Sequence, residues 1–142
     1  MKRFLISLLP FGFGFAHAKD TVDLGRLADS IAAVENAKTT HIGKAGERSR
    51  YQITRAVWTS QTSTSFLAHA SSELQADLDL QRSVAYGHLL WLYGNLEHPT
   101  VYRLAAAWNG GFHAAQTGNF SRATADYAKR VRNIYNEQKD GE

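Results

Sequence analysis

A single acidic residue closes an apolar run near the start of the sequence. Glu35 ends the run Ala-Ala-Val-Glu over 32–35, and a polar segment that contains Gly43 and Gly46 follows it. A carboxylic acid protonates a leaving oxygen at neutral pH only if its pKa is raised, and burial beside apolar groups raises it. Glycosidases need such an acid beside the bond that they cleave. Glu35 is therefore a candidate general acid, although most glutamates at helix ends are solvated or ion-paired.

Two further segments carry side chains suited to binding a sugar. The segment over 46–53 brings the amide of Gln52 back seventeen residues after Glu35, and an amide can hydrogen-bond polar sugar substituents. The run Ala-Ala-Ala-Trp-Asn-Gly-Gly over 105–111 offers Trp108 for stacking and Asn109 for a hydrogen bond. The alternatives are an ordinary hairpin, a buried tryptophan and an asparagine that caps a helix end.

The elements that must position these residues are predicted to be helices. Apolar residues recur at helical spacing through 22–34, where Thr21 is the expected cap. They do so again over 72–96, where Ser72 and Gln75 form a capping-box pattern. A further helix is expected over 100–109, ended by a break at Gly110-Gly111. A last helix is expected after Ser121, which is its expected cap.

Strand-like patterning is scarce. It is confined to the run Arg-Tyr-Gln-Ile-Thr over 50–54, and the Ser/Thr-rich tract over 59–65 is expected to be a loop. No internal repeat is visible, and a chain of 142 residues suits one domain. The sequence therefore predicts an all-α single domain of five or six helices, with a short loop or hairpin after the helix that ends at Glu35.

The first eighteen residues have the pattern of a secretory signal peptide. A basic start is followed by twelve apolar residues over 4–15 and by a small-residue box, Ala-His-Ala, over 16–18. The alternative is a buried N-terminal helix, which Pro10 and the glycines after it disfavour. Twelve apolar residues fall short of the ~20 that span a bilayer. We expect export to a periplasm or the outside, a mature domain over 19–142, and no stable insertion into a membrane.

The composition excludes several classes of function. The 16 basic residues include Lys2 and Arg3, whose loss with the signal peptide leaves 14 against 13 acidic residues, so charge gives no reason to expect nucleic acid as a partner. The absence of cysteine excludes disulfides, zinc-thiolate sites and a cysteine nucleophile. The six histidines show no i, i+4 pair, so neither metal nor cofactor is expected. A Ser-His-Asp triad built from distant residues stays open.

Four segments, in their order along the chain, resemble the lysozyme-like lytic transglycosylase family, also called soluble lytic transglycosylase-like. The family carries Glu-Ser, Gly-Leu-Met-Gln, Ala-Tyr-Asn-Ala-Gly and Tyr-x-x-Arg-Val. The matching segments here are Glu35-Asn36, Ser49-Arg50-Tyr51-Gln52, Ala107-Trp108-Asn109-Gly110-Gly111 and Tyr127-Ala128-Lys129-Arg130-Val131. The resemblance covers about 27–135 and implies a lysozyme-like fold with the loop over an active-site cleft.

The resemblance also implies roles for individual residues. Glu35 would be the single catalytic acid and base, and Tyr127 would help to orient it. The sugar cleft would be lined by Gln52, Asn109 and Trp108, the last in place of the family's tyrosine. The substrate would be the glycan strand of peptidoglycan, cleaved between N-acetylmuramic acid and N-acetylglucosamine. Glu35 would protonate the glycosidic oxygen and then accept the proton of the C6 hydroxyl, which closes a 1,6-anhydro ring without water.

Two alternatives differ in chemistry. Glu47, on the loop after Glu35, is the best candidate for a second carboxylate, and with it the enzyme would be a hydrolytic, lysozyme-like muramidase. Asp77 and Asp79 are instead expected on a solvated helix face. A helical module that binds glycan without cleaving it would need neither acid. In all three cases the partner is the peptidoglycan strand, and a monomer is expected.

Overall fold

The computed structural model describes residues 21–35 and 42–141, so the predicted signal peptide and Asn36 lie outside the described residues. The described residues form seven helices: α1 Leu24–Glu35, α2 Arg55–Gln61, α3 Phe66–His69, α4 Gln75–Asn95, α5 Val101–Gly110, α6 Phe112–Thr117 and α7 Arg122–Asp140. The all-α prediction is confirmed. The helix count exceeds five or six because the sequence pattern did not reveal the short helices α3 and α6.

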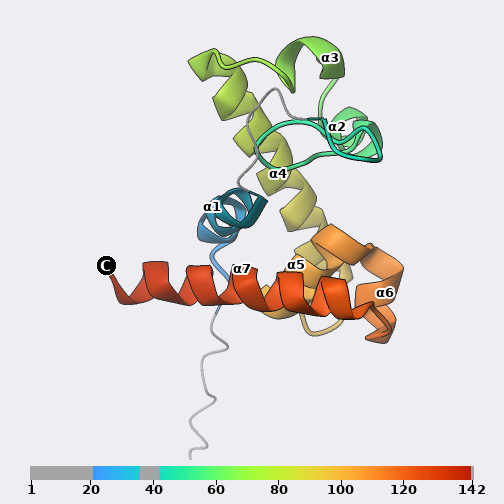
Figure 1. The fold of residues 1–142 in the computed structure, drawn as a ribbon, viewed down its shortest axis with the longest axis vertical. Coiled ribbons are helices and arrows are strands. Elements are labelled where there is room, and N and C mark those ends of the chain that lie inside the picture. Colours follow the sequence, from blue (N-terminus) through green and yellow to red (C-terminus); the bar gives the residue numbers. More distant parts are fainter. Residues whose placement is uncertain (1–20, 36–41, 142) are drawn as a thin grey trace, which may run out of the picture.

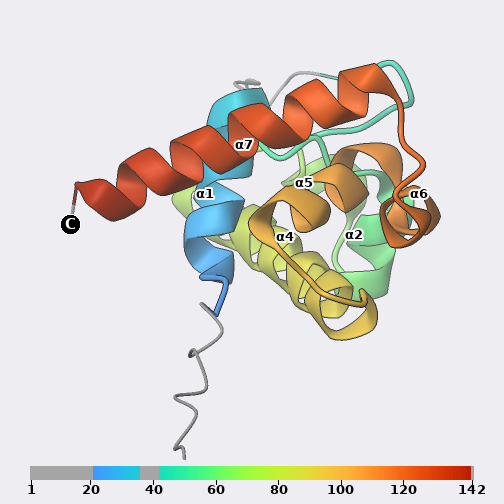
Figure 2. The same ribbon diagram turned by 90° about the horizontal axis from the view of Figure 1, so that it is seen from below.

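Helix α4 is the element around which the others are arranged. It contacts α1, α2, α3 and α5, while α7 packs against both α5 and α1. In Figure 1, α2 and α3 lie toward one end of the molecule and α5, α6 and α7 toward the other, with α1 between them. Figure 2 shows α7 crossing both α1 and α5. No helix in the described ranges is long and apolar enough to cross a membrane.

The core is made by side chains that the helices turn toward one another. Leu27 and Ile31 of α1 are fully buried, as are Leu104 of α5 and Val131 of α7. Each such side chain contributes roughly 1.5–3 kcal/mol through its burial. The chain has no cysteine and therefore no disulfide, so this burial is what holds α1, α5 and α7 together.

Side-chain caps fix where several helices begin. The hydroxyl oxygens of Thr54, Thr100 and Ser121 accept backbone hydrogen bonds at the starts of α2, α5 and α7. Each cap satisfies one of the free N–H groups of the first turn, an effect worth about 1 kcal/mol. The predicted cap at Ser121 is confirmed, and so is the break after Gly110, where α5 ends.

Two other predicted caps are wrong. Helix α1 begins after Asp23, whose Oδ1 accepts from the backbone N–H of Arg26 at 3.0 Å, so Thr21 does not cap it. Helix α4 begins at Gln75, and Ser72 instead accepts from the N–H of Leu74, outside the helix. In both cases the polar residue that the pattern selected lies two or more residues before the helix starts.

The prediction of a loop over 59–65 is wrong in part, because α2 extends to Gln61. The hydroxyl of Thr59 donates to the carbonyl of Arg55 and that of Ser60 to the carbonyl of Val57, so these side chains are satisfied within the helix. Trp58 is fully buried and anchors α2. Burial of this large ring outweighs the weak helix propensity of the Ser/Thr-rich tract.

Trp58→Ala is expected to lower the free energy of unfolding by about 3–5 kcal/mol, because it removes a fully buried ring that contacts Phe66 edge-on at 5.9 Å. Denaturant unfolding followed by circular dichroism measures this. Trp91→Ala is the matched control, since Trp91 is 47% exposed, and it should cost about 1 kcal/mol or less. Equal losses in the two variants would contradict the assignment of Trp58 to the core.

Candidate functional site

The structure brings Glu35 and Tyr127 into direct contact. The hydroxyl of Tyr127 donates a hydrogen bond of 2.8 Å to Oε1 of Glu35. Glu35 is the last residue of α1 and is partly buried, while Tyr127 lies on α7 and is only 5% exposed. The packing of α1 against α7 therefore places a neutral hydrogen-bond donor beside the candidate general acid.

Burial raises the pKa of Glu35 above its ordinary value. The hydrogen bond from Tyr127 and the positive charge of Arg130 act in the opposite direction, and the negative charge of Glu47 raises the pKa further. Burial and the charge of Glu35 also raise the pKa of Tyr127, so its hydroxyl keeps its proton and remains a donor. Glu35 thus holds its own proton to a higher pH than an exposed glutamate, as a general acid must.

The loop after Glu35 forms a tight turn through residues 43–53. Arg48 and Ile53 make reciprocal backbone hydrogen bonds of 2.9 and 2.7 Å, the one antiparallel bridge among the described residues. Ser49 and Gln52 have positive φ angles of 75° and 50°, a backbone conformation that residues other than glycine rarely adopt. The hydroxyl of Ser49 compensates by accepting from the N–H of Tyr51 at 3.2 Å. The predicted hairpin is therefore a turn closed by a single bridge.

The side chains of Glu47 and Gln52 lie on the same side of this turn. Oε2 of Glu47 accepts from the backbone N–H of Ala45 at 2.9 Å, and the amide of Gln52 donates to the carbonyl of Ser49 at 3.0 Å. Both flank Gly43, where an added Cβ would collide with the Glu47 carboxylate and lie 2.8 Å from Oε1 of Gln52. Glycine at 43 thus lets the acid and the amide come together.

Trp108 and Asn109 occupy the last turn of α5 and connect it to the rest of the site. The indole N–H of Trp108 donates to the carbonyl of Tyr51 at 3.3 Å, which joins α5 to the turn. Oδ1 of Asn109 accepts from the hydroxyl of Thr124 at 3.0 Å, which joins α5 to α7 one helical turn before Tyr127. A continuous path of contacts therefore runs from the turn through α5 and α7 to Glu35.

Three residues that sequence reasoning did not assign to the site contribute to it. Thr124 holds Asn109, the guanidinium of Arg130 lies 5.9 Å from the ring centre of Tyr127, and the imidazole of His88 meets Trp108 edge-on at 5.5 Å. Thr124 and Arg130 stand three residues before and after Tyr127, so they share its face of α7. That spacing could have identified them. Nothing local marks His88, because its contact joins α4 to α5.

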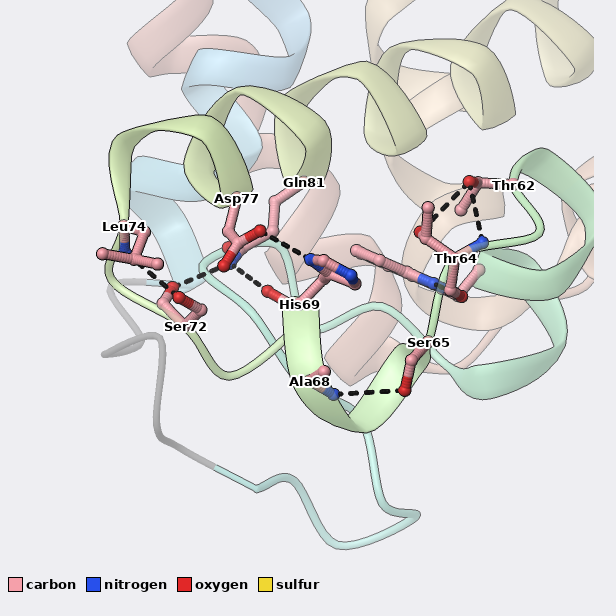
Figure 3. A network of polar contacts seen from close by, with 10 residues as sticks. Thr62, Thr64, Ser65, Ala68, His69, Ser72, Leu74, Asp77 and Gln81 are labelled. Atoms are coloured by element: carbon pink, nitrogen blue, oxygen red, sulfur yellow. Dashed lines mark hydrogen bonds and ion pairs between the residues drawn. The ribbon is translucent and has the colours of Figure 1, made fainter.

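A serine, a histidine and an aspartate also meet elsewhere, where α3 leads into α4 (Figure 3). Nδ1 of His69 lies 2.6 Å from Oδ1 of Asp77, and the hydroxyl of Ser72 also bonds to Asp77. Both bonds lower the pKa of Asp77. The carboxylate thus stands between serine and histidine, whereas a nucleophilic triad needs the histidine in the middle. Gln81 ties the same cluster to the carbonyls of His69 and Ser72, so its role is to hold α3 against α4.

The expectation that Asp77 lies on a solvated helix face is wrong, because the residue is only 9% exposed. Asp79, with which it was grouped, is exposed as expected. Residues 21–35 and 42–141 contain no group of three or more His, Asp or Glu side chains that could hold a metal ion.

Tyr127→Phe is expected to raise the pKa of Glu35, because the hydroxyl that stabilises the ionised carboxylate is lost. Carboxyl-carbon NMR titration of the variant and the parent measures the change. Tyr135→Phe is the control, since Tyr135 is a buried tyrosine of the same helix whose hydroxyl accepts from Asp23 instead. An unchanged or lower pKa in Tyr127→Phe, or an equal rise in the control, would contradict this account.

Glu35→Gln is expected to raise the free energy of unfolding at pH 7. The folded-state pKa of Glu35 lies above its ordinary value, so folding favours the protonated form, and this contribution is lost as the pH rises through the folded-state pKa. The gain from the variant should therefore shrink as the pH falls toward 4. Denaturant unfolding at a series of pH values measures it, and a gain that grew on acidification would contradict the raised pKa.

Comparison of the chain with protein-family models, with curated proteins and with solved structures gave no match. The case for a function therefore rests on the contacts around Glu35 and on the four sequence segments that supply them.

Proposed function

We propose that the protein is an exported lytic transglycosylase that cleaves the glycan strands of peptidoglycan, with Glu35 as its single acid and base. The observation that carries the proposal is the hydrogen bond that buried Tyr127 donates to Glu35. Burial also raises the pKa of Glu35. The acid is partly buried, has a fixed orientation and ends a helix beside a tight turn. Such an acid is suited to protonating a glycosidic oxygen.

The reaction begins when protonated Glu35 gives its proton to the oxygen between N-acetylmuramic acid and N-acetylglucosamine. The bond from that oxygen to C1 of the muramic acid breaks, and the neighbouring N-acetyl group stabilises the positive charge that develops. The C6 oxygen of the same sugar then bonds to C1 while its proton passes to ionised Glu35. The products are a free hydroxyl on one fragment and a 1,6-anhydro ring on the other, and Glu35 regains its starting state.

The geometry of the turn supports this assignment. At position 49 the resembled family has glycine and this chain has serine, and φ there is 75°, a conformation that favours glycine. The turn carries Gln52, and Trp108 and Asn109 are joined to it and to α7 through hydrogen bonds. We therefore assign these three side chains to sugar binding in a lysozyme-like arrangement. No cofactor is needed, and the unit of function is a monomer.

One observation favours hydrolysis as a second candidate. The negative charge of Glu47 acts on Glu35, so the two carboxylates are close enough to interact. Against this, Oε2 of Glu47 already accepts from the backbone of Ala45, which fits a role in holding the turn rather than in positioning water. Non-hydrolytic cleavage is therefore the better-supported reaction.

Mass spectrometry of the fragments released from purified peptidoglycan tests the proposal. The mature protein should yield fragments ending in 1,6-anhydromuramic acid, and Glu35→Gln should lower their rate of release by about 10²–10⁴-fold, the usual contribution of a general acid. Glu137→Gln is the matched control, because it changes an exposed glutamate of α7 and should leave the rate unchanged.

Glu47→Gln separates the two reactions. Under the proposal it keeps the anhydro products and changes the rate by less than about tenfold. Reducing-end products from the parent, lost in Glu47→Gln, would establish the hydrolase instead. Full activity in Glu35→Gln would contradict both reactions as assigned here.

A further inference from the structure

We infer that four aromatic rings on α4, α5 and α6 form a second binding surface for the sugar rings of the same glycan strand, beyond the bond that is cleaved. This aromatic row consists of Trp108, His88, Trp91 and Phe112, and the inference rests on the proposed function. We thus infer that the enzyme recognises a long glycan strand and not only the disaccharide whose bond it cleaves.

The four rings contact one another in sequence. Trp108 meets His88 edge-on at 5.5 Å between ring centres, and His88 stacks on Trp91 at 5.9 Å with an interplanar angle of 6°. Trp91 in turn contacts Phe112 at 5.3 Å and 57°. Three helices thus contribute to one row of touching rings, which begins at a residue of the proposed sugar site and in which Trp91 is exposed.

Trp91 is the member of the row that both contacts two other rings and is exposed to solvent. Its indole lies nearly parallel to the His88 ring, with 5.9 Å between the ring centres, and Phe112 packs at a tilt beside it, yet the residue is 47% exposed. Its neighbours therefore limit its rotamer freedom before any ligand arrives, which lowers the entropic cost of binding. A large ring held rigidly and left open to solvent is typical of a recognition surface.

The chemistry of the row fits a neutral sugar. Burial lowers the pKa of His88, so its imidazole is uncharged at neutral pH and none of the four rings carries a charge. A pyranose ring has apolar C–H faces that stack on aromatic rings, while its hydroxyl groups stay in water at the edge. An indole that packs against two other rings and is still 47% exposed suits this mode of binding.

The position of the row explains why a strand would follow it. Trp108 bonds to the carbonyl of Tyr51, which directly precedes Gln52, and is itself followed by Asn109. The adjoining stretch of α4 is flanked by α2, since the amide of Gln61 lies against Gly87, and by α6, since Phe112 lies against Trp91. A linear polymer that leaves the site beside Trp108 therefore meets His88 and Trp91 next.

Binding by the Glu35→Gln protein, which holds substrate without turning it over, tests the inference. Two probes are used: soluble glycan strands several disaccharides long, and the single disaccharide. Trp91→Ala in this background should weaken binding to the long strands by about tenfold, the effect of losing one well-packed aromatic contact, and should leave binding of the disaccharide unchanged. Isothermal titration calorimetry measures both.

Two variants control for folding and for loss of apolar surface. Trp91→Phe keeps an aromatic ring and should retain most of the affinity for long strands. Leu90→Ala removes a neighbouring apolar side chain that is 52% exposed and should have no effect. If Trp91→Ala binds long strands as Leu90→Ala does, or weakens both probes equally, the aromatic row is not a strand-binding surface. In that case the parent protein, with Glu35 intact, would still release anhydro products and the proposed function would stand. A parent that neither binds nor cleaves glycan would overturn the proposed function as well.

Discussion

The hydrogen bond between Tyr127 and Glu35 is the contact on which the proposed site depends. It joins residues 92 positions apart and forms only because buried side chains such as Leu27 and Val131 hold α1 against α7. A helix C-terminus disfavours negative charge, and burial disfavours it further. Glu35 is placed where both effects act, and Tyr127 offsets them in part by donating a hydrogen bond. The fold thereby supplies an acid that favours its protonated form yet can still ionise, as a group that gives and then regains a proton must.

The rest of the site is held by contacts between elements that are distant in sequence. Trp108 joins α5 to the turn, and Asn109 joins α5 to α7 through Thr124. The turn itself keeps Ser49 at a positive φ, a conformation that costs on the order of 1–2 kcal/mol in a residue other than glycine. Backbone strain of this kind persists only where the surroundings fix it, and it is concentrated at functional sites. The buried core and the capped helices provide that support.

Local signals in the sequence located several elements correctly. The end of the first helix at Glu35, the end of α5 at Gly110 and the cap at Ser121 all follow from short-range chemistry. Tertiary contacts did not follow from it. Trp58 is buried and anchors α2, which includes the first three residues of a tract whose composition indicates a loop. Asp77 is buried and bonds to His69, although it was expected on a solvated helix face. The pairing of Tyr127 with Glu35 came from the order of four motifs and not from spacing or periodicity, because no local pattern encodes which helices pack.

The dependence of turnover on pH tests the central claim most directly. If protonated Glu35 is the general acid, kcat/KM for anhydro-product release falls as the pH rises through the pKa of Glu35 in the free enzyme. In Tyr127→Phe this alkaline limb should move to higher pH, because loss of the hydroxyl raises that pKa. Tyr135→Phe should leave the limb in place. A limb that stays fixed in Tyr127→Phe, or moves to lower pH, would contradict the role assigned to this pair.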